Sequence, residues 1–263
     1  MITLRADRVH LGGDRPDPAV LHLDGGVLAD VRTGSGPADV DLGDVTVLPG
    51  LVDTHLHLGF DASPDVLTPL LEDSDEVLLQ RMVDNARTAL QAGVTTVRDL
   101  GDRRFLSLEL RERLRADPPS GPELLVSGPP LTRTRGHCWF LGGEADSEQE
   151  LRAAVRERAE RGCDVVKVMA TGGVITPGYG PHEAQYGPAE LAAVVDEARA
   201  VGLPVAAHGH GPDGIRAAVA AGVDSVEHCS WFTLEGVEPD WDVVRAMASS
   251  GIVASRRWAS CPG

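Results

Sequence analysis

One lysine stands apart in the chemistry that this sequence offers. Lys167 is the only lysine among 24 Lys and Arg residues, and it lies in the apolar stretch Asp164–Ala170. A buried cation is costly unless it is paired or neutral. Unlike an arginine, a lysine can lose its proton and become a nucleophile. The alternative is an incidental lysine left in an arginine-rich chain.

Histidines gather in three short motifs that end apolar stretches. They are His55-Leu56-His57, His208-Gly209-His210 and Glu227-His228. Alternate residues of a strand face the same side, so the two histidines of the first motif can point together. Imidazoles suit zinc, iron, nickel or manganese, and so many ligands allow two metals. Taken singly, these residues could equally be hydrogen-bonded core histidines or a polar lining.

These motifs belong to an alternation of strands and helices after Gly50. The predicted strands are 51–54, 95–98, 123–127, 165–169, 204–207, 225–227 and 252–254. The predicted helices include 76–92, 107–115, 147–161, 188–201 and 213–220. Continuous apolar strands between helices indicate a parallel sheet. We therefore expect an α/β fold of the (β/α)8 TIM-barrel type, which carries its chemistry at the carboxyl ends of the strands.

The first 49 residues form a different region. Short apolar stretches alternate with turns, and Asp24-Gly25 between two of them predicts a hairpin. Pro49-Gly50 is the predicted boundary. Residues 1–49 are thus expected to form a small β unit, half of a composite β-sandwich, and residues 50–263 the barrel.

Composition narrows the class of protein. The formal net charge of −16 argues against nucleic acid or an anionic membrane as partner. Four cysteines without paired spacing suggest free thiols, and the start lacks the apolar core of a signal peptide. We expect a cytoplasmic protein.

Several stretches resemble one known family. Leu48–His57, Ala92–Asp99, Lys167–Val174, Ala206–Gly211 and Ala221–His228 are similar, in this order, to motifs of the amidohydrolase superfamily. The resemblance covers roughly residues 1 to 254. It is closest to the imidazolonepropionase-like branch, which includes metal-dependent Xaa-Pro dipeptidases (prolidases).

The resemblance implies a role for each motif residue. His55 and His57 would bind a first divalent metal, typically zinc, and His208 and His228 a second. Lys167, carboxylated by carbon dioxide, would bridge the two ions. A bridging hydroxide would attack a carbon–nitrogen bond of a dipeptide or cyclic amide. His137, Tyr179 and His210 would contact this small-molecule substrate.

The sequence also departs from the family. The family's strand-eight aspartate, which binds the first metal and shuttles the proton, has no counterpart before Gly263, so a catalytic residue stays unassigned and one metal ion is an alternative to two. Residues 255–263 do not resemble the family and suggest a frameshifted tail. An incomplete barrel would expose sheet edges, which predicts a homo-oligomer.

Two other functions remain open at this point. The chain could be an inactive remnant, or a scaffold that binds metal without catalysis. A buried barrel lysine could also form a Schiff base, as in aldolases, although the histidines argue against this.

Overall fold

The computed structural model describes residues 1–255, and the chain divides into two compact units, 1–51 and 52–263. The first unit holds one five-stranded sheet of order β3-β2-β1-β4, in which β5 also pairs with β1. Its strands are β1 (Ile2–Val9), β2 (Asp17–Asp24), β3 (Val27–Thr33), β4 (Val40–Asp41) and β5 (Thr46–Val47). Its role as half of a composite sandwich stays a prediction. The predicted tail lies outside the described residues, apart from Ser255.

The predicted hairpin joins β2 to β3. Asp24 pairs with Val27, so Gly25 and Gly26 form a two-residue turn with φ of +56° and +82°. Both values lie in the left-handed region that two-residue hairpin turns require and that glycine adopts without strain.

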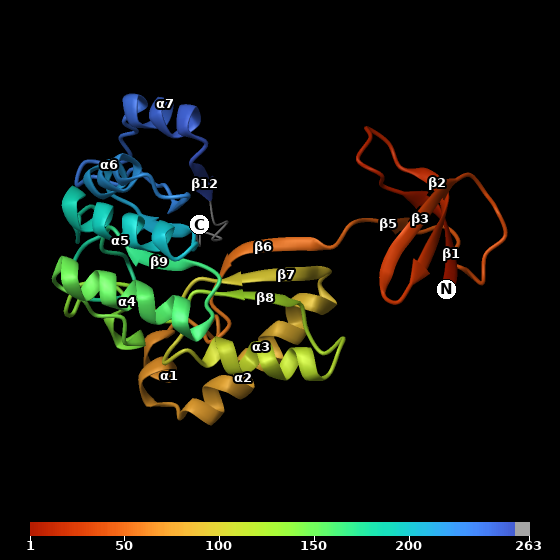
Figure 1. Cartoon of the computed structure of the whole chain (residues 1–263), viewed down its shortest axis with the longest axis horizontal. Helices are drawn as coiled ribbons and strands as arrows, with labels where there is room; N and C mark the ends of the chain where they lie inside the picture. Colours follow the sequence, from red (N-terminus) through yellow and green to blue (C-terminus); the bar gives the residue numbers. More distant parts are fainter. Residues whose placement is uncertain (256–263) are drawn as a thin grey trace. The chain divides into compact units, whose positions relative to one another are not determined.

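The second unit alternates strands with helices (Figure 1). Its strands are β6 (Leu51–Leu56), β7 (Val94–Asp99), β8 (Glu123–Val126), β9 (Val166–Met169), β10 (Val205–Gly209), β11 (Ser225–His228) and β12 (Val253–Ser255). Its helices are α1 (Leu67–Glu72), α2 (Asp75–Gln91), α3 (Leu106–Ala116), α4 (Glu148–Arg161), α5 (Pro188–Ala200), α6 (Pro212–Ala221) and α7 (Trp241–Ser250), with a 3-10 turn η1 (Trp139–Leu141). All seven predicted strands are present, and most of their ends lie within one or two residues of the predicted ends.

Helix ends follow the local sequence closely. Ser147 and Glu150 form the predicted capping box at the start of α4, and Pro188 is the first residue of α5. Helices α1 and α7 were not among those predicted. Helix α7 has Asp240 as its N-cap residue, whose carboxylate accepts hydrogen bonds from the amides of Asp242 and Val243. Gly251 is its C-cap residue.

The strands of the second unit form two sheets, β6-β7-β8 and β9-β10-β11-β12. Pairing is parallel from β9 to β12 and between β7 and β8. Leu131 joins the sheets, because its amide donates to the Lys167 carbonyl at 2.8 Å and its carbonyl accepts from the Met169 amide at 2.8 Å. The α/β class is confirmed, whereas a closed barrel is not seen within residues 1–255.

Strand alternation places Lys167 opposite the helix-packed face of β9. Val166 and Val168 are fully buried in a cluster with Leu151 of α4 and Leu191 of α5. Lys167 lies between the two valines and therefore points to the other side of the sheet. A second apolar cluster packs α2 and α3 against β7 and β8. The two cores hold the strands whose ends carry the histidines.

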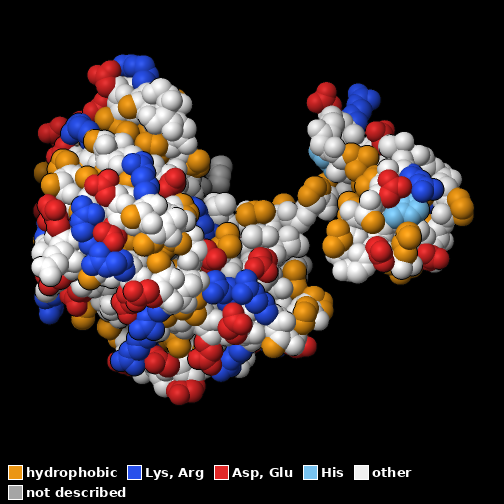
Figure 2. Space-filling model, in the orientation of Figure 1, with side chains coloured by type: hydrophobic (Ala, Val, Ile, Leu, Met, Phe, Trp, Pro, Cys, Tyr) orange, Lys and Arg blue, Asp and Glu red, His pale blue; other side chains and the backbone are white. Residues whose placement is uncertain are grey.

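Charged side chains of both signs are interspersed over the face shown in Figure 2. Arg152 and Arg156 of α4, for example, both contact Glu197 of α5. Among the helices that the structure describes, none is long and apolar enough to cross a membrane.

Exposed edge strands lead to a first prediction, that the protein associates with itself. Within residues 1–255, strands β6 and β12 each lie at the edge of a sheet, and Val52 and Val253 on them are 61% and 58% exposed. Unpaired apolar edges template strand pairing between molecules, and an edge lysine opposes it. Val253→Lys should therefore shift the protein toward monomer in sedimentation velocity. The control is Val174→Lys, at a loop position that is 76% exposed. A monomeric parent protein would contradict the prediction.

Candidate metal and substrate site

Histidine rings from three strand ends meet in one cluster. His208 at the end of β10 lies at its centre, with ring centroids 4.7 Å from His137, 4.6 Å from His210 and 4.8 Å from His228. His55 of β6 joins through His228, at 4.8 Å between centroids. The structure thus brings together residues that are far apart in the sequence.

Three of these rings could share one metal ion. One nitrogen from each of His208, His210 and His228 lies within 4.8 Å of the others. The resemblance had placed His210 with the substrate, whereas here its ring stacks on that of His228 at 4.6 Å. Its Nδ1 lies 2.9 Å from Ser230 Oγ, and its amide donates to Thr171 Oγ1 at 3.0 Å. His210 is therefore a possible ligand as well as a possible contact of the substrate.

His57 lies beside this cluster rather than within it. Its ring centroid is 5.4 Å from that of His55, and its Nδ1 is 3.1 Å from the Gly101 carbonyl oxygen. Phe60 stacks on its other side at 4.8 Å between centroids. The peptide carbonyl thus fixes the Nδ1 side of the His57 ring, so a metal would bind this residue through Nε2.

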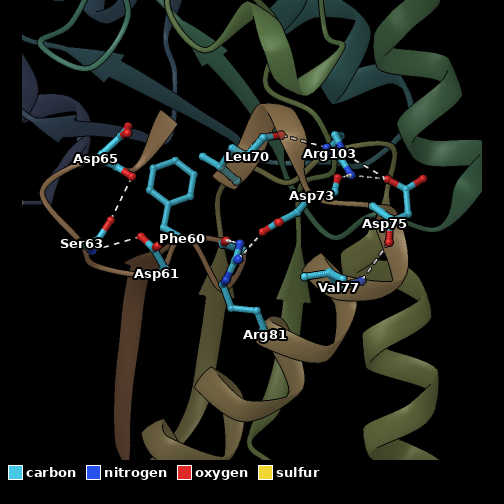
Figure 3. A network of polar contacts seen from close by, with 12 residues as sticks. Phe60, Asp61, Ser63, Asp65, Leu70, Asp73, Asp75, Val77, Arg81 and Arg103 are labelled. Atoms are coloured by element: carbon cyan, nitrogen blue, oxygen red, sulfur yellow. Dashed lines mark hydrogen bonds and ion pairs between the residues drawn. The ribbon is translucent and has the colours of Figure 1, made fainter. Parts of the chain in front are cut away.

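A polar network fixes the loop that follows His57 (Figure 3). Arg81 of α2 donates to the Gly59 carbonyl at 3.3 Å and pairs with Asp73. Arg103 donates to the Leu70 and Asp73 carbonyls at 2.8 and 2.7 Å and pairs with Asp75. Because these contacts tie the loop to α1 and α2, they also hold His57 and its stacked Phe60 in place.

Lys167 is buried with no hydrogen-bond partner for its amine. The residue is 1% exposed, and Nζ meets no donor or acceptor within residues 1–255. Burial lowers the pKa of Lys167 to about 8, although the nearby Glu227 acts in the opposite direction. A buried amine without a hydrogen bond, as Lys167 is within residues 1–255, is unusual, because the attraction of Glu227 offsets the free-energy cost of burial only in part. It indicates that another group completes the site.

Burial keeps the histidines neutral. Burial is the largest cause, and repulsion by Lys167 and by neighbouring histidines is smaller. Together they lower the pKa of His137 and of His210 to about 4 and that of His228 to about 2. The pKa of His208 is also well below its ordinary value, first because of burial. Neutral imidazoles offer the lone pairs that metal ions need. This donor set, with the unpartnered amine beside it, fits divalent metal.

Gln185 orders the loop that carries His137, a role that no sequence motif indicated. Its Oε1 accepts from the His137 amide at 2.7 Å, and its Nε2 donates to the Met169 and Thr171 carbonyls at 2.9 and 3.0 Å. The residue is 4% exposed. It therefore ties the His137 loop to the end of β9.

The two other predicted substrate residues differ in position. His137 is 6% exposed, and it packs so closely on Gly173 that a Cβ there would lie 2.3 Å from its Cε1. Its Nδ1 has no hydrogen-bond partner in the described part of the chain. Tyr179 lies on the loop after β9 and is 36% exposed. The structure places only His137 among the clustered rings.

Two aspartates near the site hold the backbone. Asp53 Oδ1 accepts from the His55 amide at 3.0 Å. Asp99 is fully buried and accepts from the amides of Leu58 and Gly101, both at 3.0 Å. Burial, with Asp102 close by, raises the pKa of Asp99 to about 8. Asp99 thus links β7 to the loops that carry His57 and its partner Gly101.

Sequence comparison finds similarity along most of the chain. The profile described as "Amidohydrolase family" matches residues 46–258. The ochratoxinase of Aspergillus niger is 33% identical over 225 residues, which is 76% of this chain and 45% of that protein. An uncharacterized protein of Mycobacterium tuberculosis is 30% identical over 236 residues, 87% of this chain and 57% of its own length. The chain spans about half the length of these curated relatives.

Solved structures show the same similarity. The crystal structure of a Xaa-Pro dipeptidase with bound methionine in the active site superposes on this chain with a TM-score of 0.81 and 27% sequence identity. The superposition covers 96% of this chain and 65% of the dipeptidase chain. The structure of A. niger ochratoxinase gives a TM-score of 0.80 at 29% identity, over 96% of this chain and 64% of its own.

Proposed function

Because this chain belongs to the amidohydrolase family, we propose that it is a metal-dependent hydrolase of carbon–nitrogen bonds in dipeptides or cyclic amides. The observation that carries the proposal is the buried histidine cluster beside the Lys167 amine, which has no hydrogen-bond partner within residues 1–255. Similarity to a Xaa-Pro dipeptidase structure favours dipeptides as the first substrates to test.

The residues divide between two sites for divalent metal. His55 and His57 would hold one ion, His208 and His228 the other, and Lys167 as a carbamate would bridge them. In its neutral form the buried amine could add to carbon dioxide with loss of a proton, and the resulting carbamate would supply two oxygen donors for metal. Zinc suits imidazole and carboxylate-like oxygen donors. When bound, the ions would polarise the scissile carbonyl and lower the pKa of water.

The remaining residues of the site would bind and orient the substrate. His137 is buried and neutral, and its Nδ1 is available to a substrate carbonyl or carboxylate oxygen. His210 would line the pocket from the other side of His208, held by Ser230. Tyr179 would contact the substrate from the more exposed loop. These groups bury the reacting bond and exclude bulk water, which strengthens the electrostatic interactions with it.

We expect the protein, purified with zinc and bicarbonate, to bind zinc stoichiometrically and to hydrolyse at least one member of an amide panel. The panel would contain Xaa-Pro dipeptides, dipeptides with other carboxyl-terminal residues, and a cyclic amide. Elemental analysis, with circular dichroism to establish folding, measures the first result, and amine release measures the second. Removal of the metal with a chelator should abolish hydrolysis.

Three outcomes separate the alternatives. A folded protein without stoichiometric metal would overturn the proposal. Bound zinc without hydrolysis of any panel member would favour a scaffold that binds metal without catalysis. Trapping of Lys167 by borohydride with a carbonyl compound would instead indicate Schiff-base chemistry.

A further inference from the structure

Glu227 is a buried carboxylate to which the proposed function gives no role. It is 0% exposed and lies on β11, directly before the candidate ligand His228. Its Oε2 lies 2.9 Å from His55 Nδ1. Its Oε1 accepts from Ser225 Oγ at 2.7 Å and from Arg98 Nη2 at 3.0 Å. The two oxygens therefore face different partners.

Its neighbours fix the orientation of this carboxylate. Arg98 of β7 is itself held, because its Nε donates to the Thr54 carbonyl at 2.7 Å. Ser225 lies two residues from Glu227 on the same strand and therefore on the same face. With Oε1 bound from two sides, the carboxylate has little freedom to rotate, and Oε2 stays directed at His55.

We infer that Glu227 is a positioning residue for His55, whose Nδ1–H it accepts so that Nε2 keeps its lone pair for a divalent ion. The inference rests on the proposed function, in which His55 is a metal ligand. A histidine ligand is commonly oriented in this way, by a carboxylate that binds the other ring nitrogen. Glu227 would thus connect β11 with the ligand pair of β6.

A direct ion pair between Glu227 and Lys167 is the other role that the geometry could offer. The ion pairs of Glu227 within residues 1–255 are with His55 at 2.9 Å and with Arg98 at 3.0 Å. The amine of Lys167 has no hydrogen-bond partner in the same part of the chain. Glu227 therefore serves His55 and leaves the lysine amine available.

The test is the tautomer of His55 in the metal-free protein. Long-range proton–nitrogen spectra of ¹⁵N-histidine-labelled protein distinguish the two tautomers, and a His55→Gln sample identifies the His55 signals. The parent protein should show Nδ1–H. In Glu227→Gln, Arg98 and Ser225 donate to the amide oxygen and turn the amide NH2 toward Nδ1. His55 should then switch to Nε2–H.

Zinc binding gives a second readout. In chelator competition, Glu227→Gln should weaken zinc binding by roughly 10–100-fold, as loss of a supporting hydrogen bond does elsewhere. The matched control is Ser225→Ala, which removes a donor to the same carboxylate without touching Oε2. Its His55 should remain the Nδ1–H tautomer.

The outcomes separate this inference from the proposed function. An Nε2–H tautomer in the parent, or an unchanged tautomer and zinc affinity in Glu227→Gln, overturns the inference alone. A parent that binds no zinc overturns the proposed function. If Glu227→Gln does not fold, the tautomer of the parent decides.

Discussion

Lys167→Arg is expected to abolish two-metal binding and hydrolysis while leaving the fold nearly intact. The substitution keeps the positive charge, but a guanidinium stays protonated and cannot take up carbon dioxide. It would place a fixed cation beside the clustered histidines, where divalent ions repel it. The loss of metal affinity should exceed the roughly 100-fold that loss of a supporting group costs. Elemental analysis and circular dichroism measure the two effects.

Lys167→Ala provides the distinguishing comparison. It removes the side chain from a fully enclosed position, so a small carboxylic acid such as acetate could take the place of the carbamate. Added acetate should restore part of the zinc binding in Lys167→Ala and none in Lys167→Arg. Two bound ions in Lys167→Arg at the affinity of the parent would show that the lysine is not a ligand.

Gln185→Leu is expected to lower both the stability of the protein and its affinity for substrate. Leucine has a similar size but leaves the Met169 and Thr171 carbonyls without their donor and the His137 amide without its acceptor. Each buried polar group without a partner costs about 1–3 kcal/mol, so the free energy of unfolding should fall by about 3 kcal/mol or more. Urea denaturation measures this loss.

The surface variant Gln80→Leu is the matched control. Gln80 donates only to Asp84 on the exposed side of α2, at 3.1 Å, and its replacement should change stability by less than about 0.5 kcal/mol. Equal effects of the two substitutions would contradict the role assigned to Gln185. In the active protein, KM should rise more in Gln185→Leu than in the control, because His137 loses its support.

The fold could be predicted largely because its strands and helices carry strong local patterns. Ser147 with Glu150 marked the start of α4, and the apolar stretch around Lys167 marked β9. Helix α1 has only six residues and no side-chain cap, so its sequence carried little information. Closure of the barrel depends on pairing between distant strands, which local patterns do not specify.

The candidate site could be predicted only where residue type and strand position coincide. His208 and His228 end predicted strands, and the structure brings their rings within 4.8 Å. Gln185 lies in a loop, and its hydrogen bonds to His137, Met169 and Thr171 depend on how that loop folds back on β9. The proximity of His210 to His228 likewise depends on the backbone at the end of β11, where His228 adopts a φ of +66°.

The two sheets of the second unit, β6-β7-β8 and β9-β10-β11-β12, meet at Leu131, and this arrangement affects the stability of the unit. Within residues 52–255, His55 lies on β6 and His57 directly after it, at the sheet β6-β7-β8. Lys167, His208 and His228 lie on β9, β10 and β11 of the other sheet. Ions held by both groups would cross-link the two sheets. By thermodynamic linkage, whatever tightens ion binding then also stabilises the docking of one sheet on the other.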